Sequence, residues 1–197
     1  MDSLKFLLYT LARIGLLIAV TAFAVLVGNI AYPALISLLP DGSTRDALMN
    51  ETLRSAASFV IILAFLVPLF YDDGRKHAAY EIWSSVNITL TLIFMVLVGF
   101  VPSIFRDSFE PGGKANVFYE YAYFPHLWLQ KTIGLDFVVS VLIGLALIAG
   151  IAYGAYLFSY KRYVKQHPVI LGGPKRGETQ LVEEEDESTG DVNLLEE

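Results

Sequence analysis

Three side chains with metal-binding chemistry follow one another near the middle of the chain. Asp73, His77 and Glu81 are spaced four residues apart, which places them on one face of a helix that begins near Asp73. Carboxylate and imidazole groups at this spacing could bind a divalent metal ion. The alternative is structural, with Asp72 or Asp73 capping a helix whose first turns are solvated. The structural alternative is the stronger one, so we expect no cofactor.

A second set of polar residues lies inside an otherwise apolar block. Ser84, Asn87 and Thr91 recur near helical spacing on one face. In lipid, such groups form hydrogen bonds with neighbouring helices, and this is what we expect here. A polar path for a transported substrate is the alternative, and Asn87, as the most polar side chain deep in the block, would be its central residue.

Small residues recur along a third candidate surface. Ala146, Gly150 and Gly154 are spaced four residues apart. Membrane helices associate where small side chains let two backbones come close, so this spacing predicts a helix-packing face. Its partner could be another protein, or Ala24 and Gly28 of the same chain.

Other chemistry finds little support in the sequence. The absence of cysteine excludes disulfides, thiolate metal sites and cysteine nucleophiles. His77, His126 and His167 are far apart, and no glycine-rich nucleotide-binding loop is present. Without a basic stripe we expect no nucleic-acid partner. We nominate no catalytic residue and do not favour an enzyme.

The elements that must position these residues are four apolar blocks. None of the four contains a charged residue or histidine, and each is near the roughly 20 residues that cross a bilayer. A soluble helix would need a polar face, which these blocks lack. The sequence therefore predicts an all-α integral membrane protein, a four-helix transmembrane bundle. The blocks are residues 15–39, 55–71, 83–105 and 137–160.

The segments outside the blocks define the expected domain organisation. We expect residues 1–13 to lie along the membrane interface, with strong tilt of the first helix or a cleaved signal peptide as alternatives. Residues 14–167 form the transmembrane domain. Residues 168–197 form a disordered tail, because residues 174–197 carry nine acidic and two basic residues and no apolar periodicity.

Basic residues in the flanks predict the orientation. With the N-terminus inside, the inner side receives nine Lys and Arg residues and the outer side five, which favours cytoplasmic termini in a cell membrane. The outer loop 106–134 contains five aromatic residues within 118–124, followed by Trp128. We expect this loop to lie on the outer interface or to cap the bundle.

Three functions are compatible with this architecture. A non-enzymatic subunit or accessory protein of a larger membrane complex is the first. A small transporter or channel component, acting as an oligomer or with an energising partner, is the second, and an enzyme acting on lipid is the third. Blocks free of ionisable groups disfavour a self-sufficient ion-coupled transporter. The expected partners are the lipid bilayer and a membrane protein or a second copy of the chain.

Overall fold

The computed structural model describes residues 3–80, 85–111 and 113–167, and every element in these ranges is a helix. Four helical stretches are long and apolar enough to cross a membrane, which confirms the predicted all-helical class with four candidate spans. Glu81, Ser84 and the predicted tail 168–197 lie outside the described residues. The four stretches are Leu4–Ile36, Glu51–Ala79, Val86–Arg106 and Phe137–Gln166.

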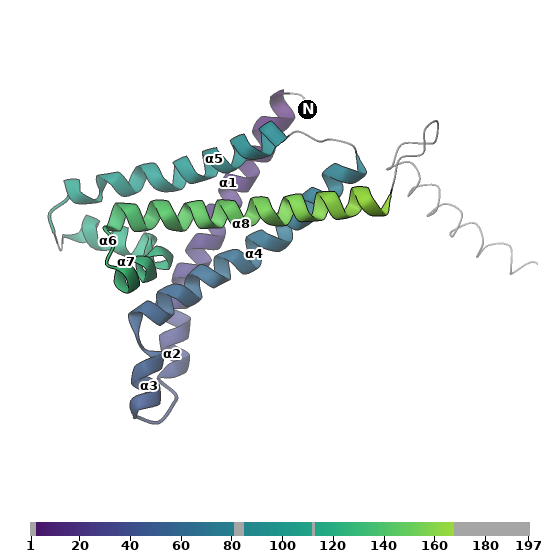
Figure 1. Ribbon diagram of the computed structural model, residues 1–197. Coiled ribbons are helices and arrows are strands. Elements are labelled where there is room, and N and C mark those ends of the chain that lie inside the picture. Colours follow the sequence, from purple (N-terminus) through teal and green to yellow (C-terminus); the bar gives the residue numbers. More distant parts are fainter. Residues whose placement is uncertain (1–2, 81–84, 112, 168–197) are drawn as a thin grey trace, which may run out of the picture.

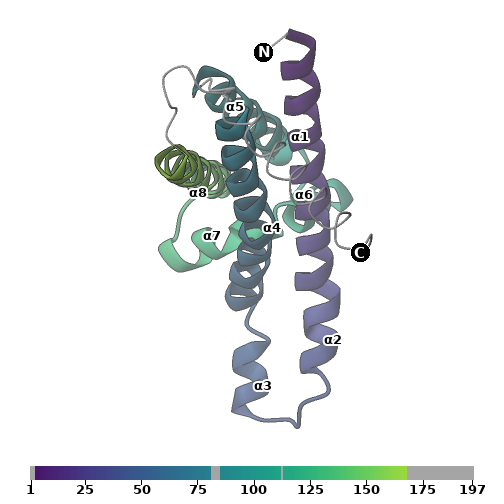
Figure 2. The same ribbon diagram turned by 90° about the vertical axis from the view of Figure 1, so that its right-hand side faces the viewer.

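The first stretch is one continuous helical rod with a change of winding inside it (Figure 2). Helix α1 (Ser3–Leu26) passes through a π-helical turn (Val27–Ala31) into α2 (Tyr32–Ile36). Pro33 explains the turn, because proline lacks the N–H of a regular helix and its ring displaces the preceding turn. The 33 residues extend about 50 Å at 1.5 Å per residue. Whether residues 3–13, its first turns, lie along an interface stays a prediction.

The second and fourth long helices begin at side-chain caps. Helix α4 (Glu51–Ala79) follows the short α3 (Ser43–Leu48) and begins at Asn50, whose side chain accepts a hydrogen bond from the backbone N–H of Thr52 at 2.8 Å. Helix α8 (Phe137–Gln166) begins at Asp136, which accepts from the backbone N–H of Val138 at 2.8 Å. Both caps satisfy N–H groups that a helix leaves unpaired in its first turn.

The remaining elements connect α4 to α8. Helix α5 (Ser85–Phe100) continues as a 3-10 helix (Val101–Ser108). Helix α6 (Lys114–Ala122), a 3-10 turn (Phe124–His126) and α7 (Leu127–Ile133) then gather around the beginning of α8 (Figure 1). Gly134 ends α7 with a φ of 72°, a conformation that glycine adopts readily.

The long helices do not lie parallel. Helix α8 packs along α4 and α5, whereas α1 crosses them at a steep inclination (Figure 1). Helices α2 and α3 form a hairpin that projects from the bundle (Figures 1 and 2). Neither α2 nor α3 contains a buried residue, so the hairpin has no core of its own.

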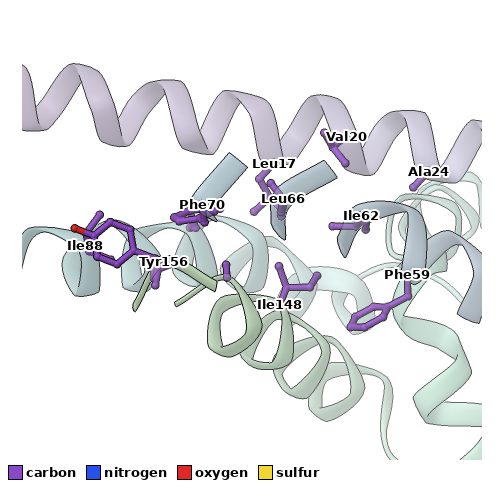
Figure 3. Packing of buried hydrophobic residues seen from close by; sticks show 13 residues of the cluster. Leu17, Val20, Ala24, Phe59, Ile62, Leu66, Phe70, Ile88, Ile148 and Tyr156 are labelled. Carbon is purple, nitrogen blue, oxygen red and sulfur yellow. The ribbon is translucent and has the colours of Figure 1, made fainter. Parts of the chain in front are cut away.

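The core lies where α1 crosses α4 and where α4 meets α8. Figure 3 shows Leu17, Val20 and Ala24 of α1 directed toward Ile62 and Leu66 of α4. Their spacing of three and four residues places each set on one helical face. The other buried members of this cluster are Phe59, Phe70, Ile88, Leu92, Met95, Ile148, Ala152 and Tyr156.

Two glycines permit the closest approaches to α8. A Cβ at Gly74 would collide with the backbone carbonyl of Tyr156, and a Cβ at Gly144 would collide with the His126 ring. Only residues without a side chain allow these contacts. The backbones of α4 and α8 therefore touch near Gly74, and the segment before α7 packs directly onto α8 at Gly144.

Candidate functional site

A cluster of polar side chains links three helices at the end of the bundle where α1 begins and α4 ends. The buried carboxylate of Asp73 accepts a hydrogen bond from the Tyr9 hydroxyl at 2.7 Å. It also accepts from Arg13, whose Nε lies 2.9 Å from Oδ2 and whose Nη2 lies 2.5 Å from Oδ1. This two-pronged geometry is the strongest form of ion pair that a guanidinium and a carboxylate make. It fixes α1 to α4.

His77 extends the cluster to α8. Its Nδ1 lies 3.0 Å from the hydroxyl of Tyr156, and the centroids of the two rings are 5.6 Å apart. The Tyr9 ring lies 5.7 Å from the His77 ring on the other side. Five side chains on α1, α4 and α8 thus form one connected network.

The network contains two of the three residues that the sequence proposed as metal ligands. Asp73 and His77 lie on the same face of α4, one turn apart, but both Asp73 oxygens accept hydrogen bonds from α1. Within the described ranges, no three histidine or acidic side chains gather closely enough to hold a metal ion. Because Glu81 lies outside those ranges, metal binding by this triad stays a prediction.

Sequence analysis missed the α1 half of this network. Tyr9 and Arg13 stand four residues apart, as Asp73 and His77 do, and both pairs flank apolar blocks. That shared spacing was the one feature of the sequence that could have suggested pairing between the two helices. Arg13 counted only as a marker of orientation because its carboxylate partner is 60 residues away in sequence.

Of the predicted polar stripe, Thr91 lies against α1. The hydroxyl of Thr91 is 3.0 Å from that of Thr10, and Thr91 also donates to the backbone carbonyl of Asn87 at 2.9 Å. Thr10 and Thr91 are buried and Asn87 is half-buried. Their arrangement is that of a hydrogen bond between helices, the expected use of such groups in lipid.

The aromatic segment 114–133 caps the opposite end of the bundle. Ser55 of α4 donates to the carbonyl of Phe124 at 2.6 Å and accepts from the N–H of Trp128 at 2.8 Å. Tyr123 donates to the carbonyl of Gly99 at 2.7 Å. These bonds join the cap to α4 and α5, and the cap buries Phe124, Pro125 and His126.

Burial shifts the pKa of two groups in this cap. It lowers the pKa of His126 to about 4 and raises the pKa of Tyr123 to about 12, because an apolar environment disfavours the charged form of each group. The His126 Nδ1 has no hydrogen-bond partner among the described residues. His126 is therefore a neutral, packed side chain at neutral pH.

The small-residue face of α8 lies on its outside. Ala146, Gly150 and Gly154 are exposed, and no atom lies within 4 Å of a Cβ built at Gly150 or Gly154. Ala24 and Gly28 are instead buried, and Gly28 lies against Ser58 and Phe124. The stripe therefore does not pack against any described part of the chain, and its use against another molecule stays a prediction.

Comparison with protein-family models, with curated proteins and with solved structures gives no match. The function is therefore argued from the residues and their geometry.

The Asp73–Arg13 pair gives a first prediction. Asp73→Asn should leave Arg13 without its counter-charge. Breaking a buried pair in this way costs about 3 kcal/mol, so the thermal midpoint of unfolding in detergent should fall clearly. Asp72→Asn is the matched control, because Asp72 pairs with Lys76 on the surface and is about half exposed. Its loss should cost no more than about 1 kcal/mol. Equal effects of the two substitutions would contradict the structural role of Asp73.

The buried His126 gives a second prediction, on pH dependence. Below its ordinary pKa of 6.5, the unfolded chain binds a proton that the folded chain excludes. The free energy of unfolding therefore has its full value above pH 6.5, and it decreases as the pH falls from 6.5 toward about 4. The difference between the pKa values of His126 in the unfolded and folded chain corresponds to a loss of about 3 kcal/mol in the free energy of unfolding.

Thermal midpoints at about pH 7.5 and about pH 4.5 test this prediction. The fall between the two pH values should be smaller in His126→Leu than in the wild-type chain. Comparing the falls cancels the effect of the substitution at neutral pH and the contribution of His77, which both proteins share. An identical fall would show that His126 is not buried in its neutral form.

Proposed function

We propose that this chain is a multi-pass integral membrane protein and a non-enzymatic subunit of a larger membrane complex. The four long apolar helices support the membrane location. The observation that carries the subunit role is the outward placement of the small-residue face on α8. A further feature, the projecting hairpin, agrees with it.

The α8 face has the composition of a helix-packing surface but no neighbour among the residues that the structure describes. Lipid tails are as apolar as leucine, so helices gain little by burying large apolar side chains against each other in a membrane. They associate where small residues allow close backbone contact and many dispersion contacts. Gly150 and Gly154 also lower helix propensity by about 1 kcal/mol each relative to alanine. A packing partner outside the chain would offset that cost.

The α2–α3 hairpin is a second exposed surface, since none of its helical residues is buried by the described part of the chain. Leu35 and Leu38 are 66% and 80% exposed, and the hairpin extends beyond the four-helix body (Figure 1). At about 50 Å, the first helix exceeds the roughly 30 Å of the hydrocarbon core. A projecting helical arm of this kind suits a protein that contacts a neighbour beyond its own bundle.

The proposed orientation has both termini in the cytoplasm of a cell with the chain in its plasma membrane. The beginning of α1 and the ends of α4 and α8 meet in the Asp73 network, so they share one side. The basic residues Lys161, Arg162 and Lys165 lie at that end of α8. Excess Lys and Arg near membrane helices favour the cytoplasmic side.

Single cysteines test the orientation, since the natural chain has none. In intact cells, Ser43→Cys in the hairpin should react with a membrane-impermeant thiol reagent. Tyr80→Cys, at the exposed end of α4, should react only after lysis. Both positions are exposed, so access and not burial decides the result. The reverse pattern would overturn the orientation.

Leucine substitutions at two glycines of α8 test the subunit role. Gly150→Leu should fold with wild-type thermal stability, because the position is open, but should lose its stoichiometric partner during purification in mild detergent. Gly144→Leu should fail to fold, because its side chain would collide with His126. Val98→Leu on the exposed face of α5 is the control and should keep the partner.

The composition of the purified complex distinguishes the alternatives. A second protein at fixed stoichiometry, retained by Val98→Leu and lost by Gly150→Leu, supports the proposal. A homo-oligomer that Gly150→Leu dissociates would place the face between copies of the chain and favour the channel-component alternative. A Gly150→Leu chain that folds and keeps every partner would show that the face contacts lipid, and would overturn the proposal.

A further inference from the structure

We propose that a groove between the ends of α4 and α8 binds a phosphate group, with an anionic phospholipid headgroup as its expected source. The groove has a volume of about 280 Å³, close to the lower limit of about 300 Å³ for small-molecule sites. It lies at the end of the bundle that carries the Asp73 network but on other residues. The inference rests on the proposed membrane location and is independent of the proposed partner.

Two guanidinium groups from different helices line the groove. Arg75 comes from α4 and Arg162 from α8, and His167 lies just beyond the end of α8. In the described part of the chain, no carboxylate lies within 4 Å of either arginine. Two arginines that line one groove and have no carboxylate partner among the described residues favour an anion, and the planar guanidinium group matches the geometry of phosphate oxygens.

The described acidic residues at this end of α4, Asp72 and Asp73, each pair with a basic side chain. Asp72 pairs with Lys76 at 2.6 Å, and Asp73 pairs with Arg13 at 2.5 Å. Among the described residues, no acidic side chain lines the groove, whereas Arg75 and Arg162 do. A phosphate oxygen would therefore meet positive charge from these two side chains.

An unpaired buried hydroxyl provides independent support. Tyr163 lines the groove and is only 5% exposed, yet its hydroxyl has no hydrogen-bond partner among the described residues. A buried hydroxyl without a partner costs free energy, and because this hydroxyl is covered, a small shift of the Tyr163 side chain would let a phosphate oxygen accept its hydrogen bond. Ser159 and Gln166 add a second hydroxyl and an amide to the same lining. The groove thus offers neutral donors as well as charged ones.

The surroundings of the groove match the level of lipid headgroups. Tyr71, which lines it, contacts Phe158 with ring centroids 6.4 Å apart, and Phe158 is 62% exposed on the apolar part of α8. Aromatic rings of this kind mark the boundary between hydrocarbon and water. Basic pockets between membrane helices on the cytoplasmic side are suited to anionic headgroups. An acyl chain could extend along Phe158 while its phosphate reaches Arg162.

Native mass spectrometry of the full chain tests the groove. The chain is released from micelles that contain equal amounts of phosphatidylglycerol and phosphatidylcholine, and retained lipid is measured. The wild-type chain should retain phosphatidylglycerol preferentially. The variant Arg75→Gln/Arg162→Gln should bind it at least about tenfold more weakly, because it loses charge-assisted hydrogen bonds. Tyr163→Phe, which removes only the hydroxyl, should weaken binding about threefold to tenfold.

The matched control removes the same charge beside the groove. Lys161→Gln/Lys165→Gln lies on the same end of α8 but outside the lining, and should keep the preference. Equal loss in this control would show diffuse attraction and overturn the site. Unchanged binding in Tyr163→Phe would overturn the role of its hydroxyl.

A second arm identifies the source of the phosphate. Inorganic phosphate is titrated into the chain in neutral detergent without phospholipid. Saturable binding that the arginine variant loses, together with no preference for phosphatidylglycerol, supports the phosphate site with a soluble source. Phosphatidylglycerol preference with weak binding of inorganic phosphate supports the headgroup. Failure of both ligands to bind overturns the inference, whatever partner the α8 face has.

Discussion

The ion pair between Arg13 and Asp73 determines how the first helix is held. In a hydrocarbon solvent, apolar packing alone selects neighbours weakly, because lipid offers a leucine side chain similar contacts. Polar contacts and close backbone approaches then decide which helices meet. The bonds of Asp73 to Arg13 and Tyr9, the contact of Thr10 with Thr91 and the packing of Gly28 against Ser58 all hold α1 in its inclined position.

The sequence predicted what local composition determines and missed what depends on distant pairing. Apolar blocks of suitable length predicted four long helices because spanning length and hydrophobicity are local properties. The true helices reach beyond those blocks and bring Arg13 and Asp73 into contact. The spacing correctly placed Asp73 and His77 on one helical face. It could not show that Arg13 is the hydrogen-bond partner of Asp73 and Tyr156 that of His77. Those partners follow from helix crossing, which no local pattern encodes.

The two glycine sets on α8 show the same limit. The four-residue spacing of Ala146, Gly150 and Gly154 predicted a packing face, whereas Gly144 received no attention. The structure buries Gly144 against His126 and leaves the repeated set exposed. Periodicity identifies a face on a helix but not the direction in which the face points. That direction depends on the neighbours of α8, and here α4 takes the opposite side.

The π-helical turn in the first helix sets the rotational phase of α2 relative to α1. A regular helix advances by about 100° per residue, and a π turn accommodates an extra residue within one turn. The buried row Leu17, Val20, Ala24 and Gly28 therefore does not continue onto α2. The direction of α2 therefore depends on the backbone winding of residues 27–31. A single-residue deletion there would rotate α2 by about 100° around the helix axis, and because Gly28 packs against Ser58 within the same turn, it would also disturb the contact of α1 with α4.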